Sequence, residues 1–141
     1  MSLDPLIRRF PETLPPEASC TAAARLMRDA NIGSVVVADG SKPLGLVTDR
    51  DLAVRVIAEG RDPQTVRLQE VMSGEPIFLS ERRSIASVIE VMRDLAIRRV
   101  MVVDDAGDLV GVITLDDLLM RTAEDLGGLA EAIRKEVAPA G

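Results

Sequence analysis

Two short segments of this 141-residue chain place a hydroxyl and a carboxylate at the same spacing. Thr48 precedes Asp51, and Thr114 precedes Asp117; each pair follows a glycine and two apolar residues. This pattern is typical of a strand that leads into a helix, whose free N–H groups and positive dipole end suit a phosphate. The threonine can donate or accept a hydrogen bond, and the carboxylate can accept two from a vicinal diol such as that of a ribose.

The same Thr-x-x-Asp spacing also describes a capping box, in which the two side chains satisfy the start of a helix. Its presence at matched positions in both halves favours a binding site. A duplicated fold, however, would also duplicate its caps. From these residues alone, ligand binding and simple capping stay about equally open.

Both segments belong to a repeat that spans most of the chain. Pro76 lies 65 positions after Pro11, whereas Gly111 lies 66 positions after Gly45. The second copy therefore has one extra residue near 105–108, in a turn that can accept it at small cost. Two copies are too few for a solenoid, so we expect one compact domain with pseudo-twofold symmetry.

Each copy is predicted to contain a helix, two strands and a second helix. The expected ranges are 17–30, 34–38, 44–47 and 49–59 in the first copy, and 85–95, 99–103, 109–113 and 116–123 in the second. Short extended segments at 12–14 and 77–79 precede the copies, and turns at 39–43 and 104–108 join the paired strands. Gly33 is expected to end the first helix by taking a positive φ.

The sequence predicts repeat 1 at 8–59, a linker at 60–75, repeat 2 at 76–123 and a C-terminal amphipathic helix or tail at 124–141. Gly127 and Gly128 are expected to break the chain before the amphipathic part, 129–137. Its apolar residues need a surface to cover them. The tail could cover these residues by docking on its own domain or on a dimer mate.

Composition excludes several functions. The chain is 47% hydrophobic, enough for a core, but it has no run long enough to span a membrane and no signal-peptide pattern, so we expect a cytoplasmic protein. With no His and a single cysteine, Cys20, it lacks the means for a zinc site, a Ser-His-Asp triad or a disulfide framework, and we expect Cys20 to be a packing residue. A net charge of −6 and only two aromatic residues argue against nucleic-acid binding.

The order of these motifs resembles a tandem pair of cystathionine-beta-synthase (CBS) domains, a Bateman module. The resemblance covers residues 11–121 and rests on the stretches 45–52, 71–73 and 97–104. It implies an α+β fold of two β-α-β-β-α repeats, packed sheet to sheet with pseudo-twofold symmetry. It also implies two clefts for an adenosine-containing ligand such as AMP, ADP, ATP or S-adenosylmethionine. The implied role is regulatory, as a homodimer that signals to a partner protein, with no catalytic residue and no metal.

The resemblance further implies that each cleft joins the Thr-x-x-Asp segment of one repeat to the leading strand and second strand of the other. By position, the first cleft would comprise Leu46, Thr48, Arg50, Asp51, Ile77, Phe78, Arg98, Arg99 and Val100. The second would comprise Thr13, Leu14, Gly33, Ser34, Val35, Val112, Thr114 and Asp117. Leu46 and Val112 would lie against the adenine.

The two implied clefts differ in charge. The first gathers Arg98, Arg99 and Arg50, and guanidinium groups suit phosphate, whereas the second has Gly33 and Ser34 at the positions of the first two. We therefore expect the first cleft to hold the phosphate-bearing nucleotide and the second to be empty, weaker or suited to a less charged ligand. Alternatively, Arg98 and Arg99 could merely be solvent-exposed charges at the end of a strand, with no role in binding.

Two other functions compete with ligand sensing. One is a dimerisation or interaction scaffold whose clefts are vestigial, so that Thr48 and Thr114 only cap helices. The other, an enzyme, is the weakest, because only carboxylates, Lys42 and Cys20 would remain for acid–base or nucleophilic chemistry.

Overall fold

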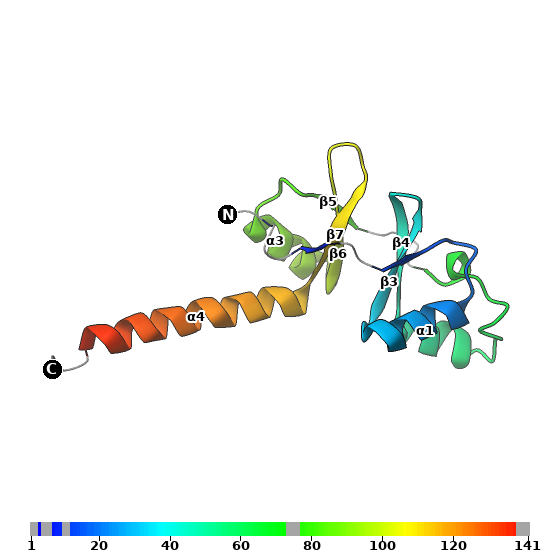
Figure 1. The fold of residues 1–141 in the computed structure, drawn as a ribbon, viewed down its shortest axis with the longest axis horizontal. Helices are drawn as coiled ribbons and strands as arrows, with labels where there is room; N and C mark the ends of the chain where they lie inside the picture. The colour runs from blue at the N-terminus through cyan, green and yellow to red at the C-terminus, as the bar shows by residue number, and fades with distance from the viewer. Residues whose placement is uncertain (1–2, 4–6, 10–11, 73–76, 138–141) are drawn as a thin grey trace.

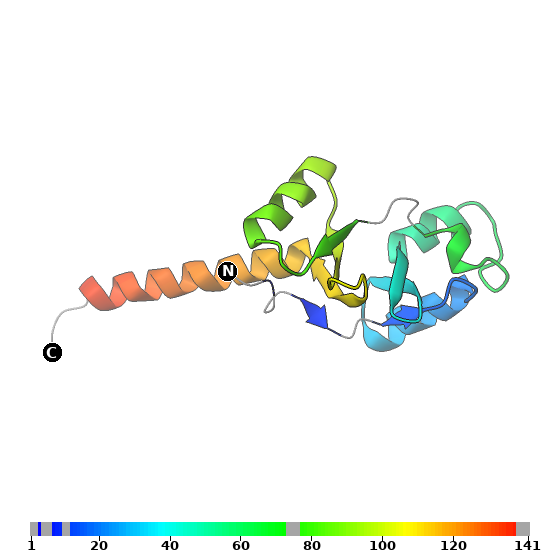
Figure 2. The same ribbon diagram turned by 90° about the horizontal axis from the view of Figure 1, so that it is seen from above.

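The computed structural model describes residue 3 and residues 7–9, 12–72 and 77–137. Two small sheets lie next to each other at the centre, helices lie on their outer sides, and one long helix projects from the body (Figures 1 and 2). Residues 73–75 of the predicted linker and 138–141 of the predicted tail lie outside the described part. None of the helices in the described ranges is long and apolar enough to cross a membrane.

Each repeat folds as a β-α-β-β-α unit, which confirms the predicted α+β fold. The first repeat contains β2 (Thr13–Leu14), α1 (Cys20–Ala30), β3 (Ser34–Asp39), β4 (Lys42–Thr48) and α2 (Asp49–Leu52), which continues as the π-helical turn η2 (Ala53–Ile57). The second contains β5 (Phe78–Ser80), α3 (Ile85–Leu95), β6 (Arg99–Val103), β7 (Leu109–Thr114) and α4 (Leu115–Val137). The strand orders are β2-β3-β4 and β1-β7-β6-β5.

The central strands β3 and β6 are buried on both faces, and alternate residues serve different cores. Val35 and Val37 pack with α1, whereas Val100 and Val102 pack with α3. The residues between them form a third core that joins the two sheets: Val36 and Ala38 from β3, Met101 from β6 and Val112 from β7. The sheet-to-sheet packing implied by the resemblance is therefore the centre of the molecule.

Strand β1 (Arg8–Arg9) precedes the first repeat but belongs to the sheet of the second. It pairs antiparallel with β7, placing Arg8 opposite Val112. Leu3 and Ile7 are buried in the core of the second repeat. The range predicted for the first repeat, 8–59, thus begins with a strand of the other sheet, and this crossing ties the two repeats together.

Helix α1 is bounded by capping residues other than those predicted. The side chain of Ser19 accepts a hydrogen bond from the backbone three residues on, so the helix begins at Cys20 rather than at residue 17. Asn31 takes the left-handed conformation that ends it, with φ 54°, and Ala96 does the same for α3, with φ 53°. The expectation that Gly33 supplies the positive φ is wrong.

Two other boundaries of the first repeat shift by a few residues. The turn predicted at 39–43 narrows to Gly40 and Ser41, because Lys42 and Pro43 already pair with β3. The helix predicted at 49–59 ends as a π-helical turn at Ile57.

The predicted linker completes the core of the first repeat as well as joining the two copies. Val66, Leu68 and Val71 are all buried in that core. The backbone N–H of Leu68, which begins the short 3-10 helix η3 (Leu68–Glu70), donates to the carbonyl of Ala18 at 2.9 Å. Removal of this segment would therefore open the first repeat.

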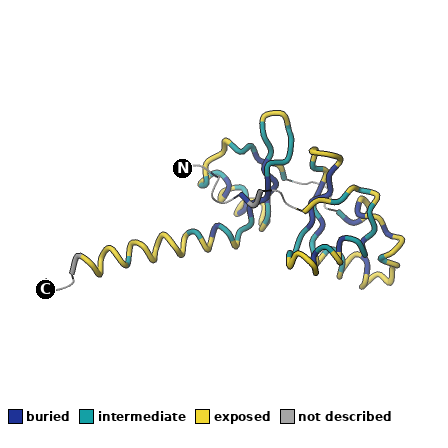
Figure 3. Tube along the Cα trace, in the orientation of Figure 1, coloured by how far each residue is buried: buried dark blue, intermediate teal, exposed yellow. Residues whose placement is uncertain are grey.

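Helix α4 corrects the prediction of a break at Gly127 and Gly128. It runs through both glycines from Leu115 to Val137, 23 residues, or about 35 Å at the usual rise per residue. A Cβ at either glycine would meet nothing within 4 Å. Beyond residue 123 the helix is largely exposed and projects away from the sheets (Figures 1 and 3).

The two hairpin loops hold each other across the repeats. Lys42 Nζ lies 2.8 Å from Asp108 Oδ1 and donates to the carbonyl of Ala106 at 2.6 Å. The hydroxyl of Ser41 donates to the same carboxylate oxygen at 2.8 Å. The extra residue of the second copy lies in its hairpin loop, 104–108, and this longer loop contacts the shorter loop of the first copy.

We predict that Gly127→Ala and Gly128→Ala stabilise the exposed part of α4. Each removes a helix penalty of about 1 kcal/mol, and the added methyl groups meet no neighbour. Hydrogen exchange of the amides around these positions should slow by roughly fivefold for each substitution. An unchanged exchange rate would mean that this part of the chain is not helical in solution.

We also predict that the contact between the hairpin loops is lost in acid. Hydrogen bonds from Lys42 and Ser41 hold the pKa of Asp108 below its ordinary value of 3.8. The stabilisation is therefore present above the unfolded-state pKa and disappears as the pH falls through the lower folded-state pKa. Asp108→Asn should lower the thermal midpoint near neutral pH but not in strong acid, as measured by circular dichroism. Asp39→Asn, which removes a charge from the end of β3 beside this loop, is the control, and an equal loss there would rule out a specific contact.

Candidate functional site

The first junction between strand and helix is a complete capping box. Thr48, which ends β4, has an extended backbone, and its hydroxyl accepts from the N–H of Asp51 at 3.1 Å. In return, Asp51 Oδ2 accepts from the N–H of Thr48 at 2.8 Å. This fixes the orientation of the carboxylate, while Oδ1 lies 3.8 Å from Arg55 Nε. Since a carboxylate offers about four acceptor sites, capping and diol binding are compatible here.

The second junction repeats the main features of this geometry. The hydroxyl of Thr114 accepts from the N–H of Asp117 at 3.1 Å. At both junctions the first helical N–H also bonds back to the residue that precedes the first strand of the hairpin, β3 or β6: Asp49 to the carbonyl of Gly33 at 3.0 Å, and Leu115 to that of Arg98 at 2.7 Å. The pseudo-symmetry therefore extends to the hydrogen bonds of the candidate sites.

Arg99, at the start of β6, crosses from the second repeat to the first junction. A Cβ placed on Gly33 would lie 3.3 Å from Arg99 Nη2 and 3.4 Å from Asp49 Oδ2. The guanidinium therefore lies against the loop that leads into β3 and near the start of α2. A larger residue at position 33 would require Arg99 to shift by a few tenths of an ångström, whereas the backbone conformation there does not call for glycine.

The structure does not bring Arg98 together with Arg99. Arg98 Nη2 lies 3.1 Å from Asp116 Oδ1, at the start of α4, and both side chains are mostly exposed. Successive residues of an extended chain point in opposite directions, which sends the two guanidinium groups to different junctions. Arg50, also expected in the first cleft, is exposed on the first turn of α2. An exposed ion pair is weak, so Arg98 can still exchange partners.

Several predicted cleft residues turn their side chains into the cores. Val35 and Val100 are each 1% exposed and face α1 and α3, so a ligand could reach only their backbone. Leu46 and Val112 both pack in the core between the sheets, as expected for residues at the base of a cleft. Leu46 is partly accessible, whereas Val112 is 5% exposed.

The strands that begin the two repeats, β2 and β5, are partly exposed to solvent. Phe78 is 40% exposed and Thr13 is also exposed, while Leu14 and Ile77 are half-buried against the two helical cores. Ser34, which pairs with Thr48 in the sheet, is half-buried.

The sequence analysis gave no role to two residues that the structure places near the first junction. The carboxylate of Asp49 lies on the same side of Gly33 as the guanidinium of Arg99, and its position directly after Thr48 could have suggested a place at this junction. Met72 packs over the motif glycine: a Cβ on Gly45 would lie 2.8 Å from Met72 Sδ and 3.3 Å from its Cβ. The stretch 71–73 carried part of the family resemblance, but nothing in its spacing indicated this contact.

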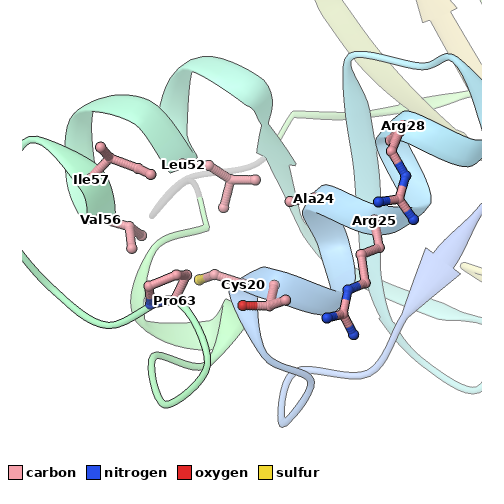
Figure 4. Close-up of a pocket in the computed structure, with 9 residues that line it drawn as sticks. Cys20, Ala24, Arg25, Arg28, Leu52, Val56, Ile57 and Pro63 are labelled. Carbon is pink, nitrogen blue, oxygen red and sulfur yellow. The ribbon is translucent and has the colours of Figure 1, made fainter.

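The lone cysteine lies in the core of the first repeat, at the start of α1 (Figure 4). Cys20 is 1% exposed, and burial raises the pKa of its thiol, which confirms a packing residue. Among residues 3, 7–9, 12–72 and 77–137, no group of three or more His, Cys, Asp or Glu side chains is placed to hold a metal ion.

A pseudo-twofold pair of β-α-β-β-α repeats, with Thr-x-x-Asp at each strand-to-helix junction, defines an α+β tandem-repeat module. The family model of the CBS domain matches residues 4–57 and 68–124. The chain belongs to the CBS-domain family, as the sequence analysis predicted.

Relatives and solved structures agree with this assignment. The CBS domain-containing protein YhcV of Bacillus subtilis is 38% identical over 106 residues, covering 75% of this chain and 74% of the relative. Hypoxic response protein 1 of Mycobacterium tuberculosis is 32% identical over 105 residues, covering 74% and 73%. The CBS domain protein PAE2072 of Pyrobaculum aerophilum, solved as a complex with AMP, has a TM-score of 0.76 and 27% identity over 84% of this chain and 90% of that one.

We predict that Gly45→Ala destabilises the protein by about 1–3 kcal/mol, the usual cost of overpacking. The new methyl group would overlap Met72, and the contact with Met72 Cβ leaves that side chain little room to move away. Urea unfolding followed by circular dichroism measures the loss. The double variant Gly45→Ala/Met72→Ala should recover part of it, and an unaffected single variant would show that Met72 does not pack there.

Proposed function

We propose that this chain is a regulatory module that binds an adenine nucleotide at the first junction and signals occupancy to a partner protein, without chemical turnover. The observation that carries the proposal is the approach of Arg99, from the second repeat, to the start of α2 in the first. A guanidinium from the second repeat and a carboxylate held by the helix cap of the first then lie at the same junction. The AMP complex of PAE2072 is consistent with this class of ligand.

Each part of a nucleotide has a matching group at the first junction. Arg99 suits the phosphate, and Arg50 lies exposed on the first turn of α2 nearby. Asp51 Oδ1 faces away from the capping hydrogen bond and suits the hydroxyl groups of ribose. Leu46, partly accessible in the layer between the sheets, suits the adenine face.

The second junction is expected to bind the same ligand more weakly. Ser34 occupies the position that corresponds to Arg99, so the first repeat supplies no guanidinium there. Arg98 lies near this junction, but the carboxylate of Asp116 beside it would compete with an anionic ligand for its guanidinium. Val112 is also more deeply buried than Leu46, which leaves less apolar surface for a base.

A dimerisation scaffold with non-binding clefts is the second candidate function. The complete capping box favours it, because Thr48 and Asp51 satisfy each other's backbone N–H groups without any ligand. The two functions differ in whether an adenosine compound stabilises the folded state.

Isothermal titration with AMP, ADP, ATP and S-adenosylmethionine tests the proposed function. We expect Arg99→Ala and Asp51→Asn each to weaken nucleotide binding by roughly 10- to 100-fold, the value of a charge-assisted hydrogen bond. Asparagine retains an oxygen that can accept from Thr48, so the helix cap survives. Ser34→Ala and Asp117→Asn are the matched controls in the other cleft and should have little effect.

Thermal unfolding gives an independent measurement. A ligand at about 100 times its dissociation constant adds roughly 2.7 kcal/mol to the folded state, and circular dichroism reports it in a chain without Trp or Tyr. No stabilisation by any of the four compounds would favour the scaffold. Loss of binding in Asp117→Asn alone would move the site to the second junction.

A further inference from the structure

The backbone N–H groups at the start of α2 are already hydrogen-bonded within the chain. The N–H of Thr48 donates to Asp51 Oδ2 at 2.8 Å, and the N–H of Asp51 donates to the Thr48 hydroxyl at 3.1 Å. The N–H of Asp49 donates to the carbonyl of Gly33 at 3.0 Å, and that of Arg50 donates to Asp49 Oδ1 at 2.8 Å. A phosphate at this junction must therefore be bound mainly by side chains.

The carboxylate of Asp49 occupies the place that an anionic ligand takes at many helix starts. Its Oδ1 accepts the Arg50 N–H in the first turn, where the helix dipole favours negative charge. Its Oδ2 would lie 3.4 Å from a Cβ placed on Gly33, so the carboxylate also lies close to the loop that leads into β3. The chain thus brings a negative charge of its own into the first junction.

Arg99 supplies a positive charge at the same point. Its Nη2 would lie 3.3 Å from the same Cβ on Gly33. Arg99 is half-buried, and within the described part of the chain its side chain makes no hydrogen bond or ion pair, whereas Arg98 pairs with Asp116. One guanidinium donates two parallel hydrogen bonds to one phosphate group. Arg99 can therefore satisfy a single phosphate.

The charges at this junction limit how many phosphates a ligand can carry. The additional phosphates of ADP and ATP would add negative charge near Asp49, and like charges at short range repel. Arg50 does not offset this repulsion, because its side chain is exposed on the first turn of α2 and solvated charges interact weakly. An adenosine ligand with one phosphate group fits this balance best.

The second junction shows that Asp49 is not required by the helix cap. Leu115 corresponds to Asp49 by the offset of 66 residues. The hydroxyl of Thr114 nevertheless accepts from the N–H of Asp117 at 3.1 Å, as its counterpart does in the first repeat. The additional carboxylate is therefore a property of the first junction and not of the fold.

We propose that Asp49 determines the specificity of the first cleft, restricting it to adenosine ligands with a single phosphate group. Arg99 binds that phosphate, and the carboxylate of Asp49 repels the further phosphates of ADP and ATP. This inference rests on the proposed function, because it names which nucleotides the same site accepts.

Isothermal titration of the full chain with AMP, ADP and ATP in magnesium-free buffer tests the specificity. Wild type should bind AMP at least tenfold more tightly than ATP, with ADP between them. Asp49→Asn retains an oxygen for the Arg50 N–H but removes the charge, so the AMP-to-ATP preference should fall by about fivefold. Circular dichroism checks that the variant folds.

Asp62→Asn is the matched control. Asp62 is also an exposed carboxylate whose Oδ1 accepts a backbone N–H, from Gln64 at 2.9 Å. Its loop is bonded to the start of α1, where the N–H of Thr21 donates to the carbonyl of Pro63, whereas Gly33 follows the end of that helix. This variant should keep the wild-type preference.

The outcomes separate this inference from the proposed function. If AMP binds and Arg99→Ala weakens it, but Asp49→Asn keeps the wild-type preference, the specificity proposal is wrong and the proposed function stands. Wild-type binding of ATP as tightly as AMP would also overturn it. So would added Mg²⁺ that makes ATP the tighter ligand of wild type but not of Asp49→Asn, since Asp49 would then serve a metal-bound polyphosphate. Failure of all three nucleotides to bind would overturn both proposals.

Discussion

The rest of the structure depends on how the central strands β3 and β6 are packed. One face of each strand lies against the helices of its own repeat, and the other face lies against the opposite sheet. Val36, Ala38, Met101 and Val112 hold the two sheets face to face. Because these strands are buried on both sides, their register is strongly fixed. The same packing sets the junctions of the two repeats beside each other, which lets Arg99 of one reach the start of α2 in the other.

Duplication gives the two junctions one backbone geometry and different chemistry. Thr48 and Thr114 accept equivalent hydrogen bonds, three residues from their donors. The charge of the two sites differs at individual positions, since Arg99 corresponds to Ser34 and Arg50 to Asp116. A symmetric fold thus supports asymmetric binding.

Local pattern predicted most elements, because strand alternation and helix caps are encoded within a few residues. The predicted ranges of α3 and β6 match the structure, and both Thr-x-x-Asp segments lie where a strand meets a helix. The failures have particular physical causes. Asn31 ends α1 where Gly33 was expected to, and α4 continues through Gly127 and Gly128 because glycine weakens a helix without forbidding it. Arg98 pairs with Asp116, a partner 18 residues away that local pattern does not reveal.

The sequence by itself determined the duplication, the order of elements, the family and the hydroxyl–carboxylate pairs at the two junctions. These properties follow from residue type and spacing along the chain. Only the tertiary structure decided that Arg99 lies at the junction of the first repeat, that β1 joins the sheet of the second repeat, and that Met72 covers Gly45. Each of these depends on the distance between segments remote in sequence, which is set by the packing of whole sheets and helices.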